Sequence, residues 1–134
     1  ERYLALEMEV MDGIFQKLDK KEDIVIDTTG SVIYTGEKIL RKLVELTKVV
    51  YLDTPLSVQN QMYSLYMEDP KPVIWGDAFF KRADESEIEA LARCYPVLLA
   101  RRTELYEKYA HVRLGYEFVR DVERNVREFL WEIE

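Results

Sequence analysis

The chain is poor in the residue types that most metal and disulfide frameworks require. It has one cysteine, Cys94, and one histidine, His111, among 134 residues. This scarcity excludes a disulfide framework, a zinc site built from histidine and cysteine, and a Cys–His metal cluster. Catalysis by a Ser-His-Asp or Cys-His arrangement would have to use His111, and no other feature of the sequence supports that role.

Positive charge and long apolar runs are also scarce. The 19 Lys and Arg residues face 26 Asp and Glu residues, which gives a net charge of −7, whereas a nucleic-acid-binding surface needs a basic patch. No apolar run approaches the ~18 residues of a membrane span, and no segment has the pattern of a signal peptide. We therefore expect a soluble protein of the reducing, cytoplasmic compartment, without a nucleic-acid or membrane partner. The oligomeric state stays open.

The residues that are present predict one folded domain. Apolar residues make up 48% and charged residues 34% of the chain, which is ordinary for a globular domain with its own core. In Glu1–Leu18 the apolar residues recur at three- and four-residue intervals, the period of an amphipathic helix. No N-cap residue precedes this pattern, so we expect the helix to continue from an upstream segment.

Short apolar runs alternate with helical patterns along the chain. We predict buried parallel strands over Asp23–Asp27, Lys48–Leu52 and His111–Tyr116, and amphipathic helices over Gly36–Thr47 and Thr54–Met67. This alternation predicts a three-layer α/β sandwich with a parallel sheet. Because sheets usually have about four to six strands, we expect an upstream strand–loop–helix–strand unit to complete it.

Capping residues and breakers set the expected helix boundaries. Thr54 is an N-cap before a proline, which is typical of a helix start. Asp84, with Glu87 three residues later, predicts the start of a long helix that ends near Tyr109 and is interrupted at Pro96. A last amphipathic helix is predicted over residues 118–133.

Residues 68–83 differ from their surroundings. They combine two prolines and a glycine with the aromatic residues Trp75, Phe79 and Phe80. Loops of this length in a compact domain are often functional lids, and we expect a mobile, lid-like loop here. The aromatic side chains could hold the loop on the core or stack on a ligand, and the sequence leaves both readings open.

Polar residues follow the first predicted strand. In doubly wound folds ligands bind at the carboxyl ends of strands, so Asp27 would point toward a site. Its carboxylate could hold a hydrated Mg²⁺ or orient an attacking hydroxyl, and Gly30 would permit the close approach of a ligand. The alternative is a turn in which Asp27 accepts hydrogen bonds from local amides, and the pattern by itself favours that alternative.

Two adjacent arginines are the next candidates. Arg101 and Arg102 point about 100° apart on a helix, so at most one of them faces a given cleft. An inward arginine can hold a carboxylate or phosphate through two parallel hydrogen bonds. The alternative is a solvated face on which they pair with Glu104 or Glu107. Elsewhere on this helix we interpret Cys94 as a small buried thiol.

Four stretches together resemble one family. Tyr95–Ala110 is similar to the shikimate kinase segment that reads Arg-x-x-x-Tyr-x-x-x-Ala-Asp, and Val49–Pro55 resembles that family's next-to-last strand and following helix start. Asp23–Ser31 resembles its strand leading into a Thr-Gly-Gly-Gly turn, and Tyr3–Glu7 its helix with Phe-Arg-x-x-Glu. The matches follow the family's order over nearly the whole chain. The chain therefore resembles shikimate kinase, a P-loop kinase of the nucleoside-monophosphate-kinase type.

The resemblance implies an ATP- and Mg²⁺-dependent kinase that phosphorylates a hydroxyl of a small, carboxylated acceptor. It places Arg102 on the acceptor carboxylate, Gly30 with Thr29 and Ser31 beside the acceptor hydroxyls, and Lys71 on the transferred phosphate. It also implies that the glycine-rich phosphate loop and the central strand precede this sequence, so that no nucleotide-binding residue is named here. Residues 1–134 would then form a single domain without its P-loop unit.

The sequence departs from the family at acceptor positions. Leu4 stands where the family has a substrate-binding arginine, and Thr29-Gly30-Ser31 replaces the triple glycine. His111 replaces the aspartate after the alanine. Shikimate itself is therefore not implied as the acceptor, and the alternative function is a catalytically inactive kinase-like binding or regulatory module. Asp27 and Lys71 are the candidate catalytic residues, with Asp27 also the candidate Mg²⁺ ligand through water.

Overall fold

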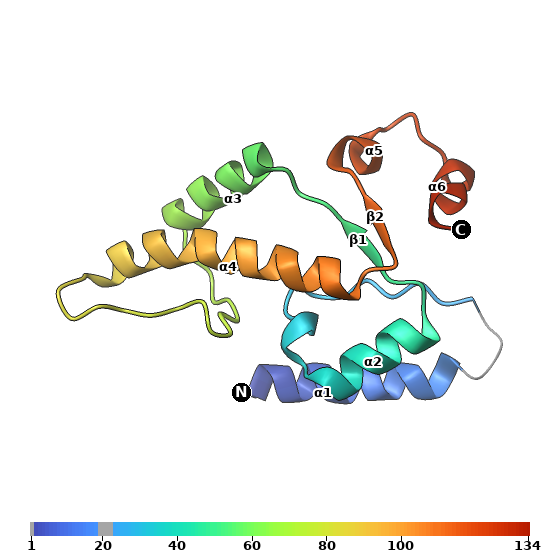
Figure 1. Ribbon diagram of the computed structural model, residues 1–134, viewed down its shortest axis with the longest axis horizontal. Coiled ribbons are helices and arrows are strands. Elements are labelled where there is room, and N and C mark those ends of the chain that lie inside the picture. The colour runs from blue at the N-terminus through green and yellow to red at the C-terminus, as the bar shows by residue number, and fades with distance from the viewer. Residues whose placement is uncertain (1, 19–22) are drawn as a thin grey trace.

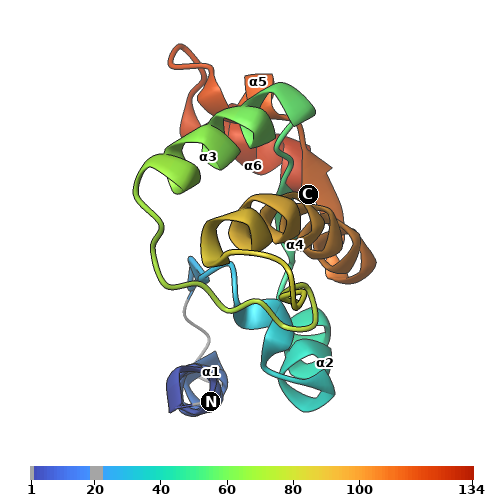
Figure 2. The ribbon, with the colours of Figure 1, turned by 90° about the vertical axis from the view of Figure 1, so that its left-hand side faces the viewer.

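The computed structural model describes residues 2–18 and 23–134 as a mostly helical, mixed α/β protein with a small parallel sheet. Helices α1 (Arg2–Leu18) and α2 (Glu37–Leu46) lie at one end of the molecule. Helices α5 (Tyr116–Arg120) and α6 (Val126–Ile133) lie at the other end, with the sheet and the long helix α4 between them (Figures 1 and 2).

The first core forms between α1 and α2. Met11 and Phe15 of α1 pack against Ile39 and Leu43 of α2, and all four side chains are buried. At the edge of this contact Lys42 Nζ lies 2.7 Å from the Asp12 carboxylate. Both predicted amphipathic helices are confirmed; Glu1, which the first prediction included, lies outside the described residues.

Strands β1 (Val50–Leu52) and β2 (Val112–Leu114) run parallel, with Val50 opposite Val112 and Leu52 opposite Leu114. Past the end of β1 the Asp53 amide donates to the Leu114 carbonyl at 2.8 Å. Two predicted parallel strands are therefore confirmed, each shorter than expected.

The predicted strand over Asp23–Asp27 is wrong. These residues have no regular secondary structure, and the Val25 side chain is 98% exposed. A strand requires a neighbouring chain to accept and donate its backbone hydrogen bonds, and no strand within the described residues pairs with this segment. A β-branched run alone does not supply that partner.

The second core joins α3 (Leu56–Glu68) to α4 (Glu87–Tyr109). Tyr66 and Tyr95 stack with ring centroids 4.1 Å apart, and Leu98 is 1% exposed beside them. The predicted helix over Thr54–Met67 is confirmed, but Pro55 and not Thr54 occupies its N-cap position.

Helix α4 corrects two expectations. It begins two residues later than predicted, with Ser86 as its N-cap and Glu89 completing the capping box. It also continues through Pro96 without interruption. Proline removes one intrahelical hydrogen bond, and the buried Tyr95 and Leu98 on either side provide the packing that offsets this loss.

The predicted last helix is split. A turn separates α5 from α6, and Asn125 starts α6 by accepting a hydrogen bond from the Glu128 amide at 3.1 Å. An asparagine that caps a new helix provides this second start. No helix within residues 2–18 and 23–134 combines the length and apolar character that crossing a membrane requires.

The α3–α4 loop (residues 69–86) follows the predicted lid-like segment closely and has no regular secondary structure. Trp75 packs on Phe79, with ring centroids 5.1 Å apart, and meets Tyr66 edge-on. Ala78 of the loop is buried, whereas Phe80 is 67% exposed. Trp75 therefore holds the loop on the second core, Phe79 packs on Trp75, and the Phe80 side chain faces solvent.

Candidate functional site

A cleft of about 400 Å³ lies between α1, the turn after residue 28, the α3–α4 loop and α4. It brings together four residues that sequence analysis assigned to the acceptor, although Arg102 is more than 70 positions from the other three along the chain. The lining residues are Tyr3, Thr29, Gly30, Ser31, Pro72, Val73, Ile74 and Arg102.

The turn at Gly30 is held from two sides. The Val32 amide donates to the Thr29 carbonyl at 3.2 Å, and the short 3-10 helix η1 (Val32–Tyr34) that follows anchors the turn through its buried Val32 and Ile33. On the other side the Tyr106 hydroxyl donates to the Gly30 carbonyl at 2.8 Å. Burial raises the pKa of Tyr106, so its hydroxyl stays protonated and remains a donor near neutral pH.

Glycine at position 30 lets α4 approach the turn. A Cβ atom at Gly30 would lie 3.0 Å from Arg102 Nη1 and 3.0 Å from the Tyr106 hydroxyl. Such contacts are tighter than van der Waals separation for carbon. Gly30 therefore allows the Arg102 guanidinium to lie directly against the backbone of the turn.

Arg102 has hydrogen-bonding capacity to spare. Its Nη2 donates to the Ile74 carbonyl of the α3–α4 loop at 3.0 Å, and its guanidinium lies over the Tyr34 ring at 5.8 Å. Its Nε is buried and has no hydrogen-bond partner among the described residues. Arg102 lines the cleft, and its Nη1 makes no hydrogen bond among the described residues, so the guanidinium is suited to an anionic group there.

Behind the turn, Glu7 of α1 holds the two hydroxyls that flank Gly30. Thr29 Oγ1 donates to Glu7 Oε1, and Ser31 Oγ donates to Glu7 Oε2 at 2.9 Å. The two hydroxyl oxygens also lie 2.8 Å from each other. The side chains on both sides of Gly30 are therefore held by Glu7 from α1.

The two candidate catalytic residues do not line this cleft. Lys71 pairs with Asp69 on the same loop, and its side chain is 71% exposed. Asp27 is exposed, and no cluster of three or more metal-ligating side chains occurs in the described ranges. Their catalytic and Mg²⁺-binding roles stay predictions.

A second cleft, of about 380 Å³, lies beside β2 and is lined by Tyr51, Glu107, His111 and Arg113 among others. Arg113 lies 2.7 Å from the Asp53 carboxylate and 2.9 Å from that of Glu107. Arg113 also lowers the pKa of Asp53 below its ordinary value, first through their hydrogen bond. Because Arg113 already pairs with both carboxylates, the second cleft is the weaker candidate for a ligand-binding site.

The remaining singled-out residues have structural contacts. Cys94 is 1% exposed, and its thiol donates to the Phe80 carbonyl at 3.6 Å, which confirms the predicted buried thiol. His111 Nδ1 accepts from the Val49 amide at 2.9 Å and so connects the chain segments leading into β1 and β2.

The residue patterns did not single out Glu7, Tyr106 or the Ile74 carbonyl as site groups. Glu7 and Tyr106 lie within the stretches that resemble the family, Tyr106 four positions after Arg102, so a signal for both was present. The Ile74 carbonyl is a backbone group and has no signature in residue type.

Comparison of the chain with protein-family models, with curated proteins and with solved structures gave no match in any of the three.

Proposed function

We propose that this protein is an ATP-dependent kinase similar to shikimate kinase, which phosphorylates a hydroxyl of a small carboxylated acceptor bound in the first cleft. The observation that carries the proposal is the position of Arg102 against the Thr29–Ser31 turn. The resemblance assigned both to the acceptor, and they meet at one cleft from distant parts of the chain. The proposal includes a three-layer fold in which β1 and β2 are neighbouring strands.

In this proposal Arg102 binds the acceptor carboxylate through its free guanidinium donors. The apolar groups of Pro72, Val73 and Ile74 cover the acceptor body and exclude water from it. ATP would be held by the phosphate loop that the resemblance places before Tyr3.

Lys71 would neutralise charge on the transferred phosphate after a movement of the α3–α4 loop. Its present partner Asp69 does not prevent this, because an exposed ion pair contributes only about 0–1 kcal/mol. Asp27 is an exposed carboxylate that could hold Mg²⁺ through water, since Mg²⁺ sites in kinases commonly use about one or two carboxylates with substrate phosphates.

A second candidate function is a kinase-like binding or regulatory module without catalysis. The exposure of Lys71, its pairing with Asp69, and Leu4 in place of the family's arginine support this candidate. Phosphoryl transfer from ATP to any bound acceptor by the intact protein supports the kinase. Binding of the acceptor without turnover supports the module.

The proposal is tested by comparing Arg102→Lys with Arg101→Lys in the intact protein. Lysine keeps the charge but loses the two-point geometry, so we expect Arg102→Lys to weaken binding of a carboxylated probe by about 1.5–3 kcal/mol. Arg101 is exposed and pairs with Glu104 at 3.0 Å, so Arg101→Lys should change the affinity by less than about 0.5 kcal/mol.

Binding is measured by titration calorimetry with shikimate, glycerate and 3-(4-hydroxyphenyl)lactate as carboxylated probes, and ATP affinity serves as the control. Both variants carry the same net charge, so a general electrostatic effect would treat them alike. Equal losses in the two variants would contradict the role of Arg102 and favour a solvated helix face.

A further inference from the structure

The first cleft has a second polar wall whose chemistry is opposite to that of Arg102. Three oxygen–oxygen contacts join Glu7, Thr29 and Ser31: one from each hydroxyl to the carboxylate and one between the hydroxyls. A hydroxyl has one proton to donate and two lone pairs to accept with. Two hydroxyl protons must therefore serve three contacts, and none is left to donate to a ligand.

The backbone supplies one further donor to Thr29 Oγ1, but it leaves the two hydroxyls without a free proton for a ligand. The Ser31 amide donates to Thr29 Oγ1 at 3.3 Å, which is a long contact. Thr29 and Ser31 line the cleft, so a ligand meets oxygen atoms that can accept hydrogen bonds there. A ligand group that binds at this wall must bring its own protons.

The negative charge of Glu7 also favours a ligand group that is positively charged. Glu7 is half-buried, and none of the ion pairs found between described residues includes it. By contrast Asp12, Asp53 and Glu85 lie 2.7 Å from Lys42, Arg113 and Arg93, respectively. A carboxylate that is partly withdrawn from water favours a cation nearby.

We propose that the acceptor is a zwitterion, a small hydroxylated amino acid whose carboxylate binds Arg102 and whose ammonium group binds at Thr29 and Ser31 above Glu7. The inference rests on the proposed function and names the class of its acceptor. The two walls adjoin, because Arg102 Nη1 lies against Gly30, the residue between the two hydroxyls. An ammonium brings three donors and a positive charge, both of which this wall lacks.

The remaining lining fits the organic body of such a molecule. Tyr3, Pro72, Val73 and Ile74 surround the polar walls with mostly apolar groups. A cleft of about 400 Å³ is within the usual range for small-molecule sites. Arg102 lines the cleft, and Glu7 lies directly behind its Thr29–Ser31 wall, so the two charges nearly cancel around the cleft, which matches a zwitterion better than a plain anion.

The test uses pairs of probes that differ only by an ammonium in place of a hydroxyl. The pairs are L-serine with glycerate, L-homoserine with 2,4-dihydroxybutyrate, and L-tyrosine with 3-(4-hydroxyphenyl)lactate, each titrated into the intact protein by calorimetry. We expect at least one amino acid to bind about tenfold more tightly than its hydroxy acid, because a hydrogen bond to a charged group exceeds a neutral one by roughly that factor.

Two variants test which residues cause the preference for an amino acid over its hydroxy acid. Glu7→Gln keeps the shape of the side chain but removes its charge, so the affinity ratio within a pair should fall close to one. Arg102→Lys should weaken both members of a pair by the same factor and leave the ratio unchanged. Loss of turn geometry alone would weaken both members together, so the ratio separates an ammonium contact from a structural role.

Thermal unfolding checks that each variant is folded. If Glu7→Gln does not fold, Ser31→Ala is measured in its place, and it should lower the ratio while keeping the Glu7 charge. Equal binding within every pair, or a ratio that survives these substitutions, would overturn the zwitterion while Arg102→Lys still supports the carboxylate site. If Arg102→Lys has no effect, or no probe binds, the proposed function and this inference both fall.

Discussion

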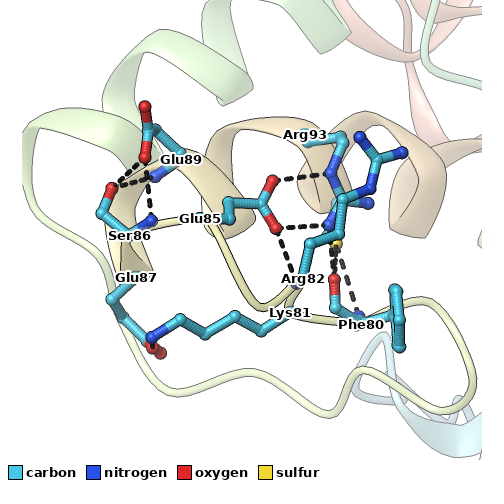
Figure 3. A network of polar contacts seen from close by, with 9 residues as sticks. Phe80, Lys81, Arg82, Glu85, Ser86, Glu87, Glu89 and Arg93 are labelled. Atoms are coloured by element: carbon cyan, nitrogen blue, oxygen red, sulfur yellow. Dashed lines mark hydrogen bonds and ion pairs between the residues drawn. The ribbon is translucent and has the colours of Figure 1, made fainter.

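Arg93 ties the α3–α4 loop to α4 (Figure 3). Its Nε and Nη2 each lie 2.7 Å from a different oxygen of Glu85, and Nη2 also donates to the Phe80 carbonyl. This two-point pairing is the strong geometry for an arginine and a carboxylate. The Arg82 amide adds a further hydrogen bond to Glu85 at 3.0 Å.

Glu85 should make stability depend on pH. The hydrogen bonds from Arg93, followed by the one from the Arg82 amide, lower the pKa of Glu85 from 4.5 to about 2. A carboxylate with a lowered pKa in the folded state stabilises the fold above about pH 4.5 and loses that contribution as the pH falls toward about 2. We therefore expect Glu85→Gln to be less stable than wild type at pH 7, with the difference shrinking below pH 4.5.

Urea unfolding of both proteins between pH 7 and pH 2 measures this difference. Glu87→Gln is the matched control, because Glu87 is 69% exposed and lies 3.7 Å from Lys81, a pair that contributes little. A stability difference for Glu85→Gln that stays constant over the whole range would contradict the role assigned to its carboxylate.

Among the elements, α4 starts two residues after the position predicted from the sequence. Asp84 with Glu87 and Ser86 with Glu89 both have the spacing of a capping box. The second pair forms it: Ser86 Oγ accepts from the Glu89 amide at 3.3 Å, and Glu89 Oε2 accepts from the Ser86 amide at 2.8 Å. Because Glu85 is used by Arg93, the chain enters the helix only after that residue.

Ser86→Ala should destabilise the protein by about 1 kcal/mol, which is typical for the loss of an N-cap side chain. Asp84→Ala removes the position that the spacing first suggested, and it should change the free energy of unfolding by less than about 0.5 kcal/mol. Chemical denaturation of both variants decides between the two starts. A larger loss for Asp84→Ala would place the cap where the sequence pattern alone predicted it.

The α3–α4 loop should exchange its amide hydrogens unevenly. Lys71 and Val73 lie in a stretch without regular structure, so we expect their amides to be among the fastest to exchange. The Ala78 amide donates to the Trp75 carbonyl at 3.0 Å and should exchange more slowly. Nucleotide or acceptor binding to the intact protein should slow exchange at Val73, which lines the cleft.

Hydrogen exchange followed by mass spectrometry, with and without ATP and a bound probe, measures this pattern. Equal protection of the loop in all conditions would indicate a static cover rather than a lid. The change in exchange on acceptor binding has a physical reason. Arg102 donates a hydrogen bond to the Ile74 carbonyl of the loop, and an acceptor that binds the guanidinium would compete with that carbonyl.

Across residues 2–18 and 23–134, the buried side chains form two separate clusters, and the sheet between them is small. One joins α1 to α2 and the other joins α3, α4 and their connecting loop. The two strands between them bury Tyr51 and Leu114. The first cleft lies between the parts of the chain that form these two clusters, since its walls come from α1, α4 and the segments beside them.

Substitutions at a buried and an exposed position of α2 should differ in their effect on the free energy of unfolding. Ile39 of α2 is fully buried, and Ile39→Ala should lower the free energy of unfolding by about 2–5 kcal/mol through lost burial and a cavity. Leu46, at the end of the same helix, is 51% exposed, and Leu46→Ala should cost less than about 0.5 kcal/mol. Similar losses in both variants, measured by urea unfolding, would contradict the packing of α2 on α1.

Local patterns in the sequence determined α1, α2, α3 and the two parallel strands, because apolar spacing reports which face of an element is buried. The resemblance to shikimate kinase singled out Thr29, Gly30, Ser31 and Arg102, which line one cleft in the structure, and their binding of an acceptor stays a prediction. The tertiary structure alone decided what depends on distant partners: the unpaired Asp23–Asp27 segment, the cap at Ser86, and the contacts of Glu7 and Arg102. These hydrogen bonds form only between groups that the fold brings within about 3 Å of each other. The spacing of residues along the chain does not predict that distance.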